Sequence, residues 1–160
     1  MKDFPVRASA YLVFAQRQDT RADVDAWDAQ AQRFFATTVA LASDAPPTAT
    51  SGAEGVRLVV RPRGEKGGVR CAFARPRDED DLRLAAAADG GRGLALVARR
   101  CPSVWLVVRD EEPDALALRL ATVMASVLLG PILDERGPEL FGVKTARAKL
   151  DALSGQTTRS

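Results

Sequence analysis

Hydrophobic and polar residues alternate along two stretches near the middle of the chain, residues 56–61 and 69–74. A period of two is typical of strands that are buried on one face. Residues 62–68 between them contain glycine and proline, which favour a turn. The pattern predicts a β-hairpin whose inner face is apolar and whose outer face carries arginine. The inner face is expected to comprise Val56, Leu58, Val60, Val69, Cys71 and Phe73.

Two further stretches, residues 7–15 and 103–109, are apolar on both faces over most of their length. Short apolar runs without alternation are expected of strands that are covered on two sides. After Thr20, a residue type favoured at helix caps, apolar residues recur at helical spacing as far as Leu41. This spacing predicts a first helix between the strand at 7–15 and the hairpin.

Two shorter helices and a loop complete this part of the chain. Four acidic residues at 78–81 precede an alanine-rich stretch, and negative charge at a helix start is favoured by the helix dipole. We therefore predict a helix that ends at Gly90 and Gly91, and a second helical piece at 94–100. The proline, serine, threonine and glycine content of residues 44–55 predicts a flexible connection.

The last third of the chain contains the most apolar helix. Residues 114–129 are apolar on nearly all sides except at Arg119 and Thr122, and Gly130 and Pro131 end the pattern. A helix that is apolar all round must be buried on all sides. Either the rest of the chain or a partner molecule provides that cover, and both alternatives remain open at this point.

A final helix is expected at 139–153, followed by a frayed tail at 154–160. The order β-α-β-β-α-β, followed by two helices, predicts the α+β class and a ferredoxin-like βαββαβ sheet with its helices on one face. A length of 160 residues, 46% of them hydrophobic and 28% charged, suits one globular domain. We therefore expect a single domain over residues 1–160, with a core at 1–110 and a C-terminal helical extension at 113–153.

The chain contains no histidine, which excludes the usual Ser-His-Asp and Cys-His nucleophilic sites and removes the commonest zinc ligand. Cys71 and Cys101 are too few for a thiolate metal site and are expected as free thiols. The acid-rich stretches 78–81 and 110–114 both stand at predicted helix starts, where carboxylates are favoured for structural reasons. We therefore expect no catalytic residue, no metal site and no cofactor.

Arginine is concentrated in and around the predicted hairpin. Between Val56 and Arg77 the chain has seven basic residues and one acidic residue. On a hairpin, Arg57, Arg61 and Arg70 would project from the same side. The simplest interpretation is a solvated face whose charges prevent edge-to-edge pairing. A nucleic-acid surface is disfavoured because no aromatic residue is expected beside these arginines for base stacking. An acidic protein partner is a third interpretation.

The absent catalytic chemistry, the basic hairpin and the surplus apolar surface of the helix at 114–129 together favour a binding protein. We expect a non-enzymatic cytoplasmic protein that binds and regulates another protein, as an inhibitor, an immunity-type protein or a dedicated partner. Apolar residues of the helix would contact the partner, and the arginines would orient it. The residues expected at this interface are Arg57, Arg61, Arg70, Leu116, Leu120 and Val127.

The alternative is a small-ligand or nucleic-acid-binding regulatory module that uses the arginine-rich hairpin face. A homodimer is also compatible with the apolar helix. No secretory signal is recognised, and the most apolar stretch, residues 115–133, is interrupted by Arg119 and Gly130. We therefore expect no membrane span and a cytoplasmic location. The net charge of +2 does not by itself indicate a nucleic-acid partner, and the abundance of arginine and alanine suggests a GC-rich bacterial gene.

Overall fold

Seven strands form one antiparallel sheet in the computed structural model, which describes residues 7–42, 48–50, 55–110 and 113–158. Every neighbouring pair of strands is antiparallel. The α+β class is therefore confirmed. In spatial order the strands are β3 (Thr37–Leu41), β5 (Val56–Pro62), β6 (Gly68–Pro76), β7 (Ser103–Val108), β1 (Ala10–Ala15), β8 (Ile132–Asp134) and β9 (Glu139–Phe141).

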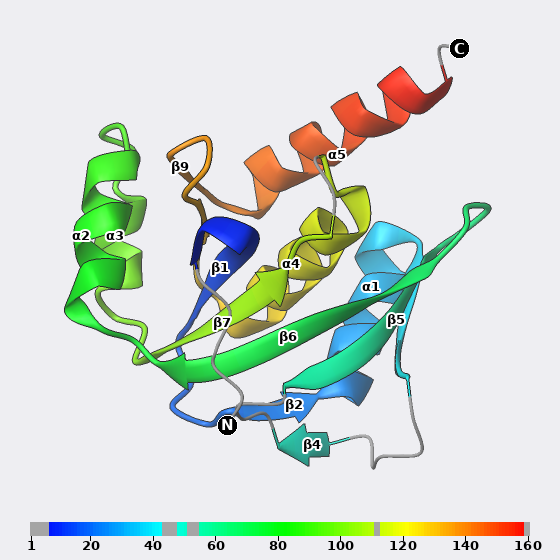
Figure 1. The fold of residues 1–160 in the computed structure, drawn as a ribbon, viewed down its shortest axis with the longest axis horizontal. Coiled ribbons are helices and arrows are strands. Elements are labelled where there is room, and N and C mark those ends of the chain that lie inside the picture. Colours follow the sequence, from blue (N-terminus) through cyan, green and yellow to red (C-terminus); the bar gives the residue numbers. More distant parts are fainter. Residues whose placement is uncertain (1–6, 43–47, 51–54, 111–112, 159–160) are drawn as a thin grey trace.

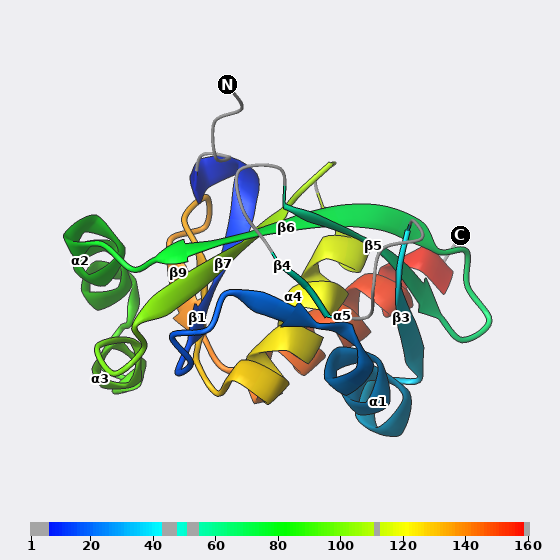
Figure 2. The same ribbon diagram turned by 90° about the horizontal axis from the view of Figure 1, so that it is seen from below.

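Helices pack on both faces of this sheet, and not on one face as the sequence suggested (Figure 1). Three helices, α1, α4 and α5, cover one face, while α2 and α3 lie against the other face at the end formed by β7, β1, β8 and β9 (Figure 2). A short ribbon of β2 and β4 lies apart from the main sheet. The bounds are α1 (Val24–Phe35), α2 (Glu79–Ala88), α3 (Leu94–Ala98), α4 (Ala115–Leu128), α5 (Val143–Thr158), β2 (Arg21–Asp23), β4 (Thr48–Thr50) and a 3-10 turn, η1 (Arg7–Ser9).

Successive side chains of β1 belong alternately to two separate hydrophobic cores. Val13 belongs to the larger core, under α1, α4 and α5, whereas Leu12 belongs to the smaller core, under α2 and α3. The prediction that this strand and β7 are covered on two sides is confirmed. In the larger core the rings of Trp27 and Trp105 meet edge to face, with centroids 5.2 Å apart, a favourable arrangement for aromatic pairs.

The first helix is shorter than predicted. Asp23 caps its start by accepting a hydrogen bond from the backbone N–H of Ala26, and the helix ends at Ala36, which has a left-handed conformation with φ of 49°. The chain then reverses into β3, which pairs with β5. Val39 and Leu41, expected on the helix, belong to this strand because alternate burial satisfies them equally well.

The prediction for the C-terminal part is wrong in one respect, because this part of the chain is not purely helical. The predicted helix at 114–129 is confirmed as α4, but the chain then forms the hairpin of β8 and β9, and the final helix begins only at Val143. Each of these strands has three residues, too few to show alternation. The last helix also continues to Thr158, so the backbone of the tail expected to fray is helical as far as that residue.

The strand order does not confirm the ferredoxin-like arrangement. A ferredoxin-like sheet would place β1 between β6 and β7, whereas β7 lies between β6 and β1. The difference arises in the connection from β6 to β7. Through α2 and α3 the chain returns to the position directly beside β6 and does not cross over β1. The outer side of β1 then pairs with β8. Of the predicted flexible loop at 44–55, residues 48–50 form β4 and Gly55 is described, while the rest lie outside the described residues.

Helix α4 is covered from within the molecule. It packs against β1 of the sheet and against α1 and α5, and most of its residues are buried. Of the two alternatives left open by the sequence, burial by the rest of the chain accounts for its apolar surface. The helix therefore acts as the central element of the larger core.

Candidate functional site

Among the described residues, no helix packs on the part of the sheet formed by β3, β5 and β6 on the face opposite α1 and α4. On this face the register places Arg57 opposite Cys71, and Val59 opposite Val69. The two helices on this side of the sheet, α2 and α3, pack at its other end. We call this surface the open sheet face. Its residues on β5 and β6 are Arg57, Val59, Arg61, Val69, Cys71 and Phe73.

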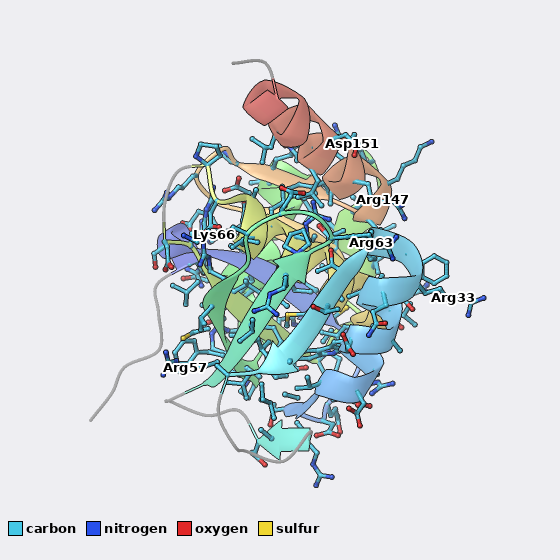
Figure 3. The ribbon with its side chains drawn as sticks, turned by 90° about the vertical axis from the view of Figure 1, so that its right-hand side faces the viewer. Arg33, Arg57, Arg63, Lys66, Arg147 and Asp151 are labelled. Carbon is cyan, nitrogen blue, oxygen red and sulfur yellow. The ribbon has the colours of Figure 1, made fainter. Side chains whose placement is uncertain are left out.

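The open sheet face has an apolar centre and a basic border. Val59, Val69 and Phe73 are half-buried, while Arg57 and Arg61 are exposed. Figure 3 shows Arg57 on one side of the sheet and Arg33 and Arg147 on the other. The two predicted hairpin arginines that reach solvent thus lie around a common apolar patch.

Arg70, the third predicted arginine, lies on the opposite face of the hairpin, so the expectation that all three project from one side is wrong. The register pairs Arg70 with Leu58, a residue of the larger core. Its Nε and Nη2 atoms donate to the carboxylate of Asp114 at 2.8 and 3.0 Å, and Nη1 lies 3.1 Å from a carboxylate oxygen of Asp110. With 8% exposure, Arg70 joins β6 to the start of α4.

Asp114 is completely buried and has two structural roles. It accepts hydrogen bonds from Arg70 and also caps α4 by accepting from the backbone N–H of Ala117 at 3.0 Å. Burial by itself raises the pKa of Asp114. Hydrogen bonds from Arg70 and from the backbone N–H groups of Asp110 and Ala117 outweigh that effect, so the pKa lies below its ordinary value.

The apolar residues predicted to meet a partner lie inside the molecule or at its margin. Leu120 is fully buried, whereas Leu116 and Val127 are half-buried and pack against the larger core. The structure therefore does not bring Leu120 to the surface with the arginines. Sequence reasoning missed the apolar centre of the open sheet face because it assigned Phe73 and its neighbours to the interior.

The first acidic stretch is used at the start of α2. Asp78 and Asp81 form a reciprocal capping box, and the Arg75 guanidinium donates to Asp81 at 2.7 and 2.9 Å. Burial raises the pKa of Asp81, but the bonds from Arg75 and Asp78 and the charge of Arg7 hold it below the ordinary value. Among the described residues, no group of three or more cysteines, aspartates and glutamates could hold a metal ion.

The two cysteines differ in their surroundings. Cys71 is half-buried on the open sheet face, whereas Cys101 is buried in the smaller core. Burial raises the pKa of the Cys101 thiol to about 11, against a small opposing effect of Arg77. Cys71 therefore provides a thiol at the centre of the candidate site, while Cys101 is chemically protected.

No family model, no curated protein and no solved structure matches the chain. Within the described part of the chain, no helix combines the length and the apolar character needed to cross a membrane. Function must therefore be inferred from the chemistry of the protein's own surfaces.

Proposed function

We propose that this is a non-enzymatic cytoplasmic protein that binds and regulates another protein, and that the partner docks on the open sheet face. The observation that carries this proposal is the combination of a half-buried apolar centre with exposed Arg57 and Arg61 beside it. Protein interfaces have this anatomy: an apolar centre that excludes water, surrounded by a polar border in which arginine is enriched.

The charge of the hairpin indicates the chemistry of the partner. Arg57, Arg61 and Lys66 are exposed on or near this face, and Glu65 is the one acidic residue in the hairpin sequence. A partner with an acidic border around an apolar patch would be complementary. Complementary charge accelerates the encounter and fixes the orientation of the two proteins.

A binding role without catalysis is supported by the use of the acidic residues. Asp81 and Asp114 are engaged by Arg75 and Arg70, and both stand at helix starts. Such carboxylates are held ionised by permanent partners, which leaves them poorly suited to take up and release protons near neutral pH. The chain also contains no histidine, the side chain whose ordinary pKa lies nearest to neutral pH.

A nucleic-acid-binding module is the second candidate, and one observation favours it. Phe73 lies on the same face as Arg57 and Arg61, so that, against expectation, an aromatic residue accompanies the arginines. Single-strand binding normally uses several stacking aromatics, and Phe73 is half-buried. Binding of single-stranded RNA that weakens steeply with salt and is lost in Phe73→Ala would favour this candidate.

The direct test is affinity capture from cells with the native chain and two matched double variants. Arg57→Glu with Arg61→Glu reverses the charge of the open sheet face. Arg99→Glu with Arg100→Glu makes the same change in charge on exposed residues after α3, at the other end of the molecule. We expect a protein retained by the native chain and by the α3 variant to be lost from the sheet-face variant. A partner retained equally by all three, or by none, would contradict the proposal.

A further inference from the structure

A second basic surface lies on the helical side of the sheet, around a hollow of about 450 Å³ between α1, α4, α5 and the turn from β5 to β6. We call it the arginine cleft. Four arginines line it, together with one aspartate and an exposed phenylalanine. These residues are Arg33, Arg63, Arg119, Arg147, Asp151 and Phe34.

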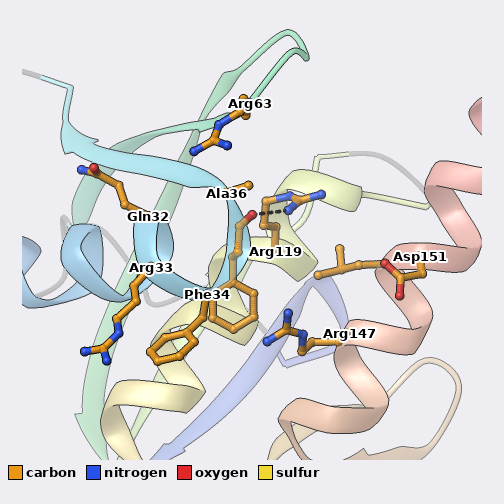
Figure 4. A pocket seen from close by; sticks show the side chains of 10 residues that line it. Gln32, Arg33, Phe34, Ala36, Arg63, Arg119, Arg147 and Asp151 are labelled. Carbon is orange, nitrogen blue, oxygen red and sulfur yellow. Dashed lines mark hydrogen bonds between the residues drawn. The ribbon is translucent and has the colours of Figure 1, made fainter.

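The arginines of the cleft come from four different elements. Figure 4 shows Arg63, from the turn, and Arg147, from α5, on either side of Arg119, which comes from α4. Arg33 lies at the margin, on α1, with its guanidinium 5.1 Å from the Phe34 ring centroid. This convergence is produced by tertiary structure and is not visible as a motif in the sequence.

Two of these guanidinium groups are held in place before any ligand arrives. The Nη1 atom of Arg119 donates to the backbone oxygen of Phe35 at 3.1 Å and to Oγ1 of Thr37 at 3.2 Å. Arg147 lies over the Phe35 ring, 4.9 Å from its centroid. Contacts of both kinds fix a guanidinium while leaving other donors free. The cleft is therefore partly preorganised, which lowers the cost of ordering on binding.

Positive charge in the cleft is only partly compensated. Glu65 approaches Nη2 of Arg119 at 4.0 Å, and Asp151 is the one acidic residue in the lining. Arg33, Arg63 and Arg147 form no ion pair within the part of the chain that the structure describes. By contrast, Arg70, Arg75 and Arg109 are each paired with a carboxylate. Three arginines that form no ion pair among the described residues thus line the same hollow.

The shape and chemistry of the cleft indicate a phosphate group. A carboxylate is planar and is satisfied by the fork of one arginine, whereas a phosphate has several charged oxygens that accept from different directions. A hollow of this volume also exceeds the needs of one ion and falls in the range of sites for small organic ligands. Phe34, 43% exposed, offers an apolar surface for the organic part.

We propose that the arginine cleft binds a small organic phosphate, with the phosphate group on Arg63, Arg119 and Arg147 and the organic part against Phe34. This site is separate from the open sheet face. A second hollow, of about 410 Å³, adjoins it and is lined by both Arg61 and Arg63. Variants of the arginine cleft are therefore made at Arg63, which lines both hollows, and at Arg147 and Phe34, which line only the cleft.

Calorimetric titration of the full chain at low ionic strength tests this proposal with two probes, phenyl phosphate and inorganic phosphate. We expect phenyl phosphate to bind more tightly, and each of Arg63→Gln and Arg147→Gln to weaken it about tenfold, the usual effect of one lost charged hydrogen bond. Phe34→Ala should remove the preference for phenyl phosphate. Arg99→Gln, at an exposed arginine far from the cleft, should change neither affinity.

Three results would overturn the proposal. If neither probe binds, the cleft is not an anion site. Equal weakening by Arg99→Gln and Arg147→Gln would show that the attraction is a property of overall charge. Inorganic phosphate binding as tightly as phenyl phosphate would remove the organic part of the ligand. The two proposals can fail separately. Loss of a protein partner from Arg57→Glu with Arg61→Glu tests the open sheet face, whereas loss of phenyl phosphate from Arg147→Gln tests the arginine cleft.

Discussion

Arg57 and Arg70 have similar surroundings in the sequence but opposite roles in the structure. Arg57 is exposed, whereas Arg70 is buried against Asp114. Alternation correctly separates the two faces of each strand but does not say which face meets the core. On β6 the larger apolar side chains face outward, and Ala74 faces inward, opposite Trp105. The inward place of Arg70 depends on a carboxylate 44 residues away, which no local pattern reveals.

The burial of Arg70 predicts a large effect of its removal. In Arg70→Met the carboxylate of Asp114 stays buried without its charged partner, and breaking such a pair typically costs about 3–5 kcal/mol of unfolding free energy. Arg57→Met, on the neighbouring strand, changes an exposed side chain and should cost no more than about 0.5 kcal/mol. Urea denaturation of both variants measures the difference. Equal losses would contradict the structural role of the buried pair of Arg70 and Asp114.

The same pair makes stability depend on pH in acid. Burial alone would raise the pKa of Asp114, but the bonds from Arg70 and from the backbone hold it below the ordinary 3.8. The unfolded chain therefore takes up the proton first. The stabilisation is complete above pH 3.8 and is lost as the pH falls through the lower pKa of the folded state. We expect the unfolding free energy of the native chain to fall in this window, and to fall less steeply in Arg70→Met; parallel curves would refute this role.

At the scale of elements, β3 shows how the structure protects a sheet edge. This strand forms one edge of the sheet, and an exposed edge is open to pairing with another chain. Asp28 of α1 blocks part of it, because its Oδ1 atom accepts from the backbone N–H of Val39 at 2.9 Å. The short connection through Ala36 keeps helix and strand close enough for this contact.

Removal of the Asp28 carboxylate should therefore free the edge. We expect Asp28→Ala to lose about 1–2 kcal/mol of unfolding free energy and to self-associate more strongly with concentration. Asp25→Ala, an exposed aspartate on the same helix, is the matched control and should leave self-association unchanged. Light scattering over a concentration series provides the measurement, and identical behaviour of the two variants would contradict a protective role.

The elements that sequence reasoning found and missed differ in length and context. The longer strands and α4 could be predicted because their periodicity extends over several residues. The boundary between α1 and β3 could not, because Val39 and Leu41 fit a helical spacing as well as an alternating one. The strands β8 and β9 are defined by their pairing with each other and with β1, and three residues are too few for a local signal.

At the scale of the whole molecule, basic residues form two surfaces on opposite sides of the sheet (Figure 3). Arg57 and Arg61 could be predicted as a surface pair from the hairpin alone. The arginine cleft could not, because Arg33, Arg63, Arg119 and Arg147 are brought together only when four elements pack. Conversely, the apolar residues of α4 suggested a surface patch because one sequence does not show that α1 and α5 cover this helix.

The central claim, that a protein partner covers the open sheet face, is tested most directly at Cys71. This thiol lies on that face and is half-buried, whereas Cys101 is buried and its pKa is about 11. Iodoacetamide at mildly alkaline pH should therefore alkylate Cys71 and spare Cys101 in the free protein. In a complex with the captured partner we expect the alkylation rate of Cys71 to fall severalfold. A stable complex in which Cys71 reacts as fast as in the free protein would contradict the claim.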